Sequence, residues 1–367
     1  MFFDELIAET ERQLNVCNSC RYCEGYCPVW PAMELRTELT KGDITHLANL
    51  CHDCRDCFSA CMYTAPHEFN INPPAVFTQV REHTYAKYVW PRRSPGVMRG
   101  RRGIAVAYAA IVALLVLLSV LTNATAFEST TTGSAYDLLR HQLLIAVVMV
   151  PALWSIGLMS LALVRYWRDT HGPVRDLFNG PAWATTLNQS ARMTHQSGAG
   201  EGCTYEENEP SASRRHTHQL VMYGFMLTFV ATFAAAIEEN ILGLQPPYPY
   251  LSVPVITGSV GGIMAVIGCV ALIRLKKRSD PLQTTATMRQ ADYGLLWALL
   301  ILMISGLLVL LTRLTMAFGP FLVVHLAAVI IAFGIMPYTK FVHWTYRILA
   351  IYKDNFERAQ ARLKVTA

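Results

Sequence analysis

The stretch "CNSCRYCEGYCP", from Cys17 to Pro28, has four cysteines with the spacing C-x-x-C-x-x-C-x-x-x-C. The same spacing returns 34 positions later in "CHDCRDCFSAC", from Cys51 to Cys61. Three ligands two residues apart can wrap a compact loop around one metal group. The fourth cysteine is separated from the third by three residues instead of two, and it then points away from that group. The repeat therefore predicts two metal groups that share the two runs.

This spacing is typical of chains that hold two [4Fe–4S] clusters. We expect one cluster on Cys17, Cys20, Cys23 and Cys61, and the other on Cys51, Cys54, Cys57 and Cys27. Structural zinc, the main alternative, uses pairs of ligands separated by longer loops and fits two three-plus-one runs poorly. Disulfides are disfavoured because no signal peptide is recognisable, and clustered cysteines in a reducing compartment are typical of metal ligands.

The rest of the chain has the composition of a membrane protein. Of 367 residues, 53% are hydrophobic and only 16% are charged, whereas soluble domains are about a quarter charged. The net charge of +5 gives no indication of nucleic-acid binding. Six apolar stretches approach or exceed the roughly 20 residues needed to cross a bilayer as a helix; they lie at about 104–122, 142–164, 220–240, 252–275, 293–312 and 321–343.

We therefore expect a mainly α fold: a small helical head with two [4Fe–4S] clusters, followed by a six-span bundle. Basic flanks such as "RLKKRSDP" fall on one side of the membrane if the N-terminus is cytoplasmic. This predicts a multi-pass protein of the cytoplasmic (inner) membrane with both termini in the cytoplasm. The expected divisions are a head (1–72), a linker (73–103), a membrane domain (104–346) with a long inner loop (165–219), and a cytoplasmic tail (347–367). Within the inner loop, the Gly/Ser/Glu-rich stretch "HQSGAGEGCTYEENEPSAS" is expected to be irregular.

Histidines at the ends of the spans are candidate haem ligands. His325 and His343 are 18 residues apart, which in one continuous helix is five turns and roughly 27 Å, close to the thickness of the bilayer core. We expect Pro337 to bend this helix and to shift the ideal phase somewhat. His218, with His216 as its neighbour, lies at the same membrane depth as His343 and is its expected partner at the inner surface. His141 is the expected partner of His325 at the outer surface. One haem b at the inner side is expected and a second, outer one is possible, while a histidine solvated at the interface is the alternative for each residue.

Other residues have more ordinary explanations. Cys203, in a Gly-rich part of the inner loop, is expected to be an incidental or structural thiol. Glu238 and Glu239 end the third span, where they meet the headgroups or carry protons for a quinone. No dinucleotide-binding fingerprint or nucleophile–base pair is recognisable, so flavin and substrate chemistry are assigned to another protein.

Several stretches resemble the tricarballylate- or citrate-utilisation protein B family. They are the two cysteine runs, "APHEFNINPP", "GEGCTY", "HTHQLVMYGF" and "HLAAVIIAFGIMPYTKFVHWTYR". The head also resembles the two-cluster ferredoxins of heterodisulfide-reductase-type and succinate-dehydrogenase-type subunits. The membrane part is similar in style to the haem-b subunit of respiratory nitrate reductase, but it lacks a second histidine ten residues into the helix of His218. That difference argues against the outer haem.

The resemblance implies an electron-transfer role. A cytoplasmic FAD-dependent dehydrogenase acting on a tricarballylate- or citrate-type substrate would give electrons to the clusters, and these would reach the quinone pool through haem b. The chain would then be an enzyme only as the quinone-reducing subunit of such a pair. Two alternatives remain open at this stage: electron flow from quinol to a cytoplasmic reductase, and an iron–sulfur redox sensor anchored in the membrane.

Overall fold

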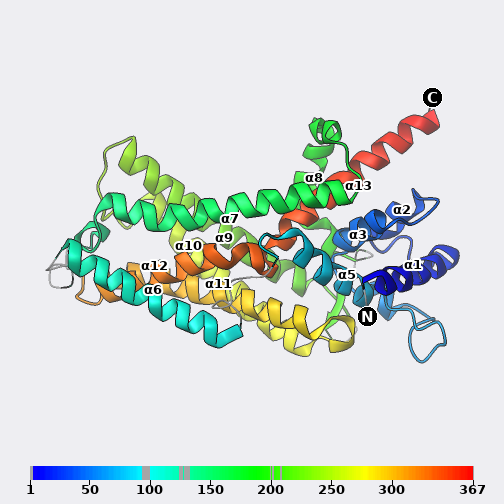
Figure 1. Cartoon of the computed structure of the whole chain (residues 1–367), viewed down its shortest axis with the longest axis horizontal. Coiled ribbons are helices and arrows are strands. Elements are labelled where there is room, and N and C mark those ends of the chain that lie inside the picture. Colours follow the sequence, from blue (N-terminus) through cyan, green and yellow to red (C-terminus); the bar gives the residue numbers. More distant parts are fainter. Residues whose placement is uncertain are drawn as a thin grey trace.

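The computed structural model describes residues 3–92, 100–123, 127, 133–198, 200, 202–206 and 209–366. The fold is mainly helical, with a small head at one end of a long bundle, and both chain termini lie at the head end (Figure 1). The head contains α1 (Phe3–Cys20), α2 (Val29–Glu34), α3 (Lys41–Leu50), α4 (Asp56–Ser59) and α5 (Pro73–Tyr88). The bundle contains α6 (Gly100–Thr122), α7 (His141–Asp169), α9 (Ser213–Asn240), α10 (Val253–Arg278), α11 (Ala286–Thr312) and α12 (Phe318–Ile335).

Local sequence signals begin the head helices. The Thr40 hydroxyl accepts a hydrogen bond from the Asp43 amide, and the Asp43 carboxylate accepts one from the Thr40 amide, which forms a capping box at the start of α3. The Asn72 side chain caps α5, whose first residue is Pro73. The apolar faces of α1, α3 and α5 then bury a shared core that includes Leu14, Ile44, Leu47, Phe77 and Val80.

The C-terminal helix α13 (His343–Thr366) completes this head core. Ala350 and Ile351 are 0% and 2% exposed and pack among the head residues. The Arg36 guanidinium, just after α2, forms an ion pair of 2.7 Å with Glu357 of α13. The residues expected to form a linker (73–103) and a tail (347–367) therefore include two helices of the head's own packing unit.

This packing predicts that the head depends on the far end of the chain. Ile351→Ala should destabilise the head by about 2–5 kcal/mol, because it leaves a cavity in the core. The same change at Leu363, which is 63% exposed on the same helix, should have little effect. Loss of the head fold on a urea gradient, followed by near-UV circular dichroism of the detergent-solubilised chain, measures both. Equal midpoints for the two variants would contradict the shared core.

Among the described residues, six helices are long and apolar enough to cross a membrane. They cover Gly103–Thr122, His141–Asp169, Ser213–Asn240, Val253–Arg278, Ala286–Thr312 and Phe318–Tyr338. The six spans expected from the sequence are confirmed. Their outward-facing side chains are apolar: Leu121, Val150, Phe233 and Leu311 are each more than 60% exposed. Lipid is the solvent that such surfaces require.

The prediction of one continuous helix from 321 to 343 is wrong. Helix α12 ends at Ile335 and is followed by two short 3₁₀ turns, η6 (Met336–Tyr338) and η7 (Lys340–Val342), before α13 begins at His343. Pro337 cannot donate a backbone hydrogen bond to Phe333, and the Ser155 hydroxyl of α7 donates to that carbonyl instead. Five continuous turns therefore do not relate His325 to His343, and the positions of their rings depend on the break.

Helices α9 and α10 approach each other closely through small residues. A Cβ atom added at Gly224 would lie 2.6 Å from the Gly261 carbonyl oxygen and the Ala265 nitrogen, and one added at Gly268 would lie 2.8 Å from Val221. Backbones in membrane bundles come this close where glycine or alanine leaves room. The contact fixes the position of α9, which carries His218.

We expect Gly224→Ala to lower the thermal midpoint in detergent by a few degrees, because overpacking of this kind costs about 1–3 kcal/mol. Gly294→Ala on α11 is the matched control, since an added Cβ there meets no atom within 4 Å and alanine favours helix. A thiol-reactive dye that reports unfolding can follow both variants. A midpoint for Gly224→Ala at or above that of the control would contradict the close approach.

The inner loop has regular elements, and one of them, a hairpin, lies in the Gly/Ser/Glu-rich stretch that was expected to be irregular. It contains η3 (Val174–Phe178), α8 (Gly180–Arg192), η4 (Thr194–Gln196) and a two-stranded antiparallel hairpin, β1 (Cys203–Glu206) and β2 (Glu209–Ser211). The Trp183 ring of α8 stacks on Tyr352 of α13, with centroids 4.3 Å apart. Shorter 3₁₀ turns, η2 (Ala135–Asp137) and η5 (Pro281–Gln283), lie in other connections. The loop thus packs against the same helix that completes the head.

Candidate metal centre

The two cysteine runs lie where helices of the head end. Cys17 and Cys20 are in the last turn of α1, and Arg21 then adopts a left-handed conformation (φ 54°) that turns the chain out of the helix. Cys51 caps the C-terminal end of α3, and Asp53 (φ 57°) is likewise left-handed. These turns convert two helix ends into loops whose side chains point inward.

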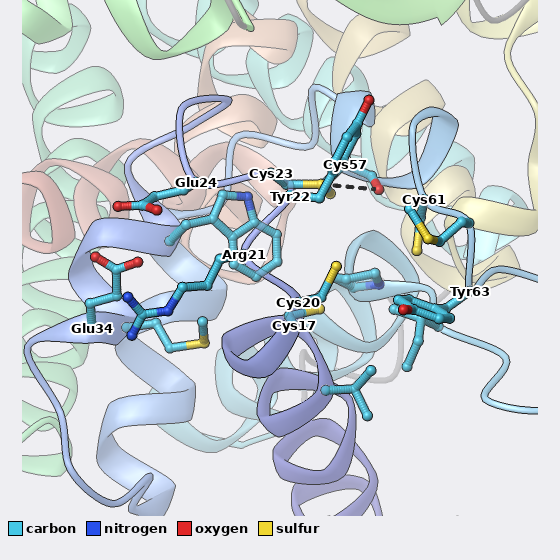
Figure 2. A pocket seen from close by; sticks show the side chains of 16 residues that line it. Cys17, Cys20, Arg21, Tyr22, Cys23, Glu24, Glu34, Cys57, Cys61 and Tyr63 are labelled. Atoms are coloured by element: carbon cyan, nitrogen blue, oxygen red, sulfur yellow. Dashed lines mark hydrogen bonds between the residues drawn. The ribbon is translucent and has the colours of Figure 1, made fainter.

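The runs exchange their fourth cysteines, as three-plus-one spacing requires. Five cysteines line one pocket: Cys17, Cys20, Cys23, Cys57 and Cys61. Figure 2 shows their sulfurs around it, together with Arg21, Glu24 and Glu34. Four line a neighbouring pocket: Cys27, Cys51, Cys54 and Cys57. Cys61 thus lies with the first run and Cys27 with the second, and Cys57 borders both pockets.

The arrangement of sulfurs fits clusters better than single ions. Within the part of the chain that the structure describes, no three His, Cys, Asp or Glu side chains converge closely enough to hold one metal ion. A tetrahedral zinc site has metal–sulfur bonds of about 2.3 Å and so needs its sulfurs about 4 Å apart. Cysteines around the rim of a pocket instead suit a larger iron–sulfur group at its centre.

The electrostatics of the thiols indicate metal ligation in general. Burial, with Cys61 nearby, raises the pKa of Cys17 to about 12, and burial raises the pKa of Cys23 to about 12 as well. Cys54 and Cys57 have pKa values well above the usual range for the same reason. Thiolates at this density need a compensating positive charge, which iron supplies when it displaces the protons.

The hairpin of the inner loop covers the second run. The Asp56 carboxylate accepts hydrogen bonds from the Thr204 amide (2.8 Å) and hydroxyl (2.7 Å). Cys203 is fully buried and packs against Cys54 and Cys27. Its isolation in the sequence suggested a structural or incidental thiol, and the structure places it beside the second group of cysteines. The "GEGCTY" motif was the signal that could have suggested this position.

The inner pair of histidines meets at the base of the head. The His218 and His343 rings are 6.2 Å apart, centre to centre, and perpendicular. Imidazoles on opposite faces of a haem iron, with metal–nitrogen bonds of about 2 Å and ring centres about 1 Å beyond, lie about 6 Å apart. The His343 Nδ1 donates to the Lys340 carbonyl (2.6 Å), which leaves Nε2 as the ligating nitrogen. These two residues fit an axial pair, whereas His216 is exposed on α9.

His325 and His141, which were expected to form a pair, contact different residues. The His325 Nδ1 lies 2.9 Å from the Ser305 hydroxyl of α11. His141 lies 3.4 Å from the Glu239 carboxylate and packs edge-on against Tyr136, which donates a hydrogen bond to the same carboxylate. Among the described residues, no ring contact joins His141 to His325. Glu239 thus contacts two side chains at the C-terminal end of α9.

Four arginines, none of them expected from the sequence as part of a cysteine site, surround the second run. They are Arg55, Arg81, Arg214 and Arg347. The Arg347 guanidinium donates to the Cys51 carbonyl (2.9 Å), and Arg81 donates to the Ala48 carbonyl (2.6 Å). Arg214 donates to the Asp53 carbonyl. Arg347 follows His343 by one turn of α13, so this helix joins the histidine pair to the cysteine loop.

We expect the two groups of cysteines to be separable by mutation. Cys61→Ser and Cys27→Ser should each leave about half of the wild-type iron, because each removes a ligand from a different cluster. The double variant Cys17→Ser/Cys61→Ser should match the first single variant, whereas Cys27→Ser/Cys61→Ser should lose iron from both sites. Iron and sulfide analysis with EPR spectra measures this.

Cys203→Ser is the control, because it alters a buried thiol next to the second site without removing a proposed ligand. It should keep the full iron content. Iron loss in Cys203→Ser equal to that in Cys27→Ser would contradict the ligand set, as would additive loss in Cys17→Ser/Cys61→Ser.

The fold and the cysteine runs define a multi-pass membrane protein with a ferredoxin-like head, whose eight cysteines indicate two iron–sulfur clusters. Family models described as "Citrate utilization protein B Fer4-like domain" and "Citrate utilization protein B" match residues 10–87 and 97–364. Citrate utilization protein B of Escherichia coli is 35% identical over 359 residues, which cover 97% of this chain and 93% of that protein. The chain belongs to the citrate utilization protein B family, which confirms the resemblance seen in the sequence. No solved structure matches it significantly.

Proposed function

We propose that this protein carries electrons from a reduced cytoplasmic FAD-dependent dehydrogenase to the membrane quinone pool. When bound, two [4Fe–4S] clusters and one haem b would carry single electrons between the head surface and the inner face of the bundle. The name of the Escherichia coli relative supports citrate utilization as the setting, so a citrate- or tricarballylate-type acid is the proposed substrate of the partner. Membrane orientation follows the basic flanks, with the head and both termini in the cytoplasm.

The observation that carries the proposal is the common position of the second cysteine group and the His218–His343 pair. Arg347 reaches the Cys51 carbonyl at 2.9 Å from the helix that begins with His343. Electron carriers must lie close together, and one helix here joins both candidate sites. A membrane anchor for a sensor would have no need of paired imidazoles beside its clusters.

The first cysteine group is the proposed point of entry. Cys20 is exposed, and Tyr22 and Met62 beside the same pocket are 59% and 60% exposed. A flavoprotein docked on this surface would approach the cluster of Cys17, Cys20, Cys23 and Cys61 directly. Exposed aromatic and methionine side chains are frequent at protein interfaces, which supports docking here.

Spectra of the detergent-purified chain test the route. We expect EPR signals of two reduced [4Fe–4S] clusters and, after dithionite, the optical α-band of haem b. Menadiol or ubiquinol analogues added to the oxidised protein should reduce that haem. Iron–sulfur signals without a haem band would overturn the route through haem, and zinc without iron would overturn the clusters.

The ligand pair gives a sharper test. His218→Ala and His343→Ala should each abolish the same haem b band, because both imidazoles bind one iron. His216→Ala changes an exposed histidine two residues from His218 and should keep the band. If only one of the first two variants loses it, the pairing is wrong. A second haem band that survives in both and disappears in His325→Ala would restore the outer haem.

A further inference from the structure

The two cysteine groups lie in opposite electrostatic surroundings. Arg21, Glu24 and Glu34 line the pocket of the first group, so acidic side chains outnumber basic ones there. Arg21 and Glu24 are both exposed, and water and salt screen exposed charges. This pocket therefore provides little fixed positive charge for its metal group.

The loop of the second group, by contrast, is surrounded by the four arginines named above. Arg55 is 2% exposed and Arg81 is 5% exposed, and Arg347 and Arg214 are half-buried. The acidic side chains nearby are Asp53 and Asp56, and the second of these is bound by the hairpin through Thr204. Four cations thus face two carboxylates around this loop, in a region with little water to screen them.

Three of these arginines donate to backbone carbonyls of the loop. Arg214 donates to Asp53, and Arg347 donates to Cys51, which is a proposed ligand. Arg81 donates to Ala48 in the last turn of α3 and, at 3.4 Å, to Cys51 as well. Because each hydrogen bond holds its guanidinium against the loop, the positive charge has a fixed position relative to the second group. These arginines are therefore positioned to act on a metal group there without ligating it.

We infer that these four arginines, Arg55, Arg81, Arg214 and Arg347, raise the reduction potential of the second cluster. We call them the arginine collar. The second cluster is then the preferred electron site at the membrane side of the head. Reduction of a [4Fe–4S] cluster adds one electron and one negative charge, with no bond formed or broken. Fixed cations nearby favour the reduced form, and the net charge around a cluster is one of the factors that set its potential. Burial alone would disfavour the added charge, and the collar offsets that penalty. The inference rests on the clusters of the proposed function but not on its haem.

Arg347 is the positioning residue to test, because it contacts the proposed ligand Cys51 and shares a helix with His343. The experiment is an EPR-monitored redox titration of the full-length protein in detergent, with signals assigned by Cys61→Ser and Cys27→Ser. In Arg347→Gln, the midpoint of the second cluster should shift to a more negative potential while that of the first stays unchanged. Arg347→Lys should remain near the wild-type midpoint because it keeps the charge, although it loses the planar donor geometry.

Arg165→Gln is the matched control, since Arg165 also donates to a backbone carbonyl at the junction of head and bundle (Tyr88, 2.9 Å) but contacts no cysteine loop. It should move neither midpoint. If Arg347→Gln fails to assemble the second cluster, Arg214→Gln removes another cation from the same loop and should produce the same negative shift. Unchanged midpoints in the Gln variants, or equal shifts of both clusters, would overturn the inference.

The outcome is distinguishable from failure of the proposed function. A negative shift of the second cluster in a protein without a haem band would support the collar and overturn the haem route. A haem band with unchanged cluster midpoints in the Gln variants would support the haem route and overturn the role of the collar.

Discussion

The hydrogen bond from the Arg347 guanidinium to the Cys51 carbonyl joins two residues that are 296 positions apart in the chain. One end belongs to the loop that holds a group of cysteines, and the other to the helix that follows the last membrane span. Around it, Ala350 and Ile351 of the same helix fill the head core. The packing of the cysteine-binding head therefore depends on α13, which follows the last span. The same contact sets the position of the cysteines relative to His343.

That dependence explains why the head can be small. Fewer than 90 residues at the N-terminus contribute its helices, and domains of this size bury a limited core. Metal ligation supplies part of the folding free energy in such domains, and here α13 and the inner-loop hairpin supply packing as well. Thr204 binds Asp56 next to Cys57, and Cys203 covers the second run. Two distant segments, α13 and the hairpin, thus stabilise one metal-binding unit.

The histidines illustrate where reasoning from sequence succeeded and where it did not. The pairing of His218 with His343 was predicted from their similar depth in the membrane, and their rings are neighbours in the structure. The predicted five continuous turns between His325 and His343, however, are absent. Pro337 breaks the helix, and the Ser155 hydroxyl of α7 binds the carbonyl that is released. A proline in sequence signals a break, but whether a neighbouring helix stabilises that break depends on tertiary packing.

The sequence alone determined the six spans and the division of the cysteines into two reciprocal groups. Both are local properties, since span length is set by the bilayer and cysteine spacing by the geometry of one loop. Only the tertiary structure decided that α5 and α13 belong to the head, that Cys203 lies beside the second group, and that buried arginines surround one group but not the other. Those features arise where separate surfaces meet, and a buried guanidinium is stable there only because carbonyls from a distant loop accept its hydrogen bonds.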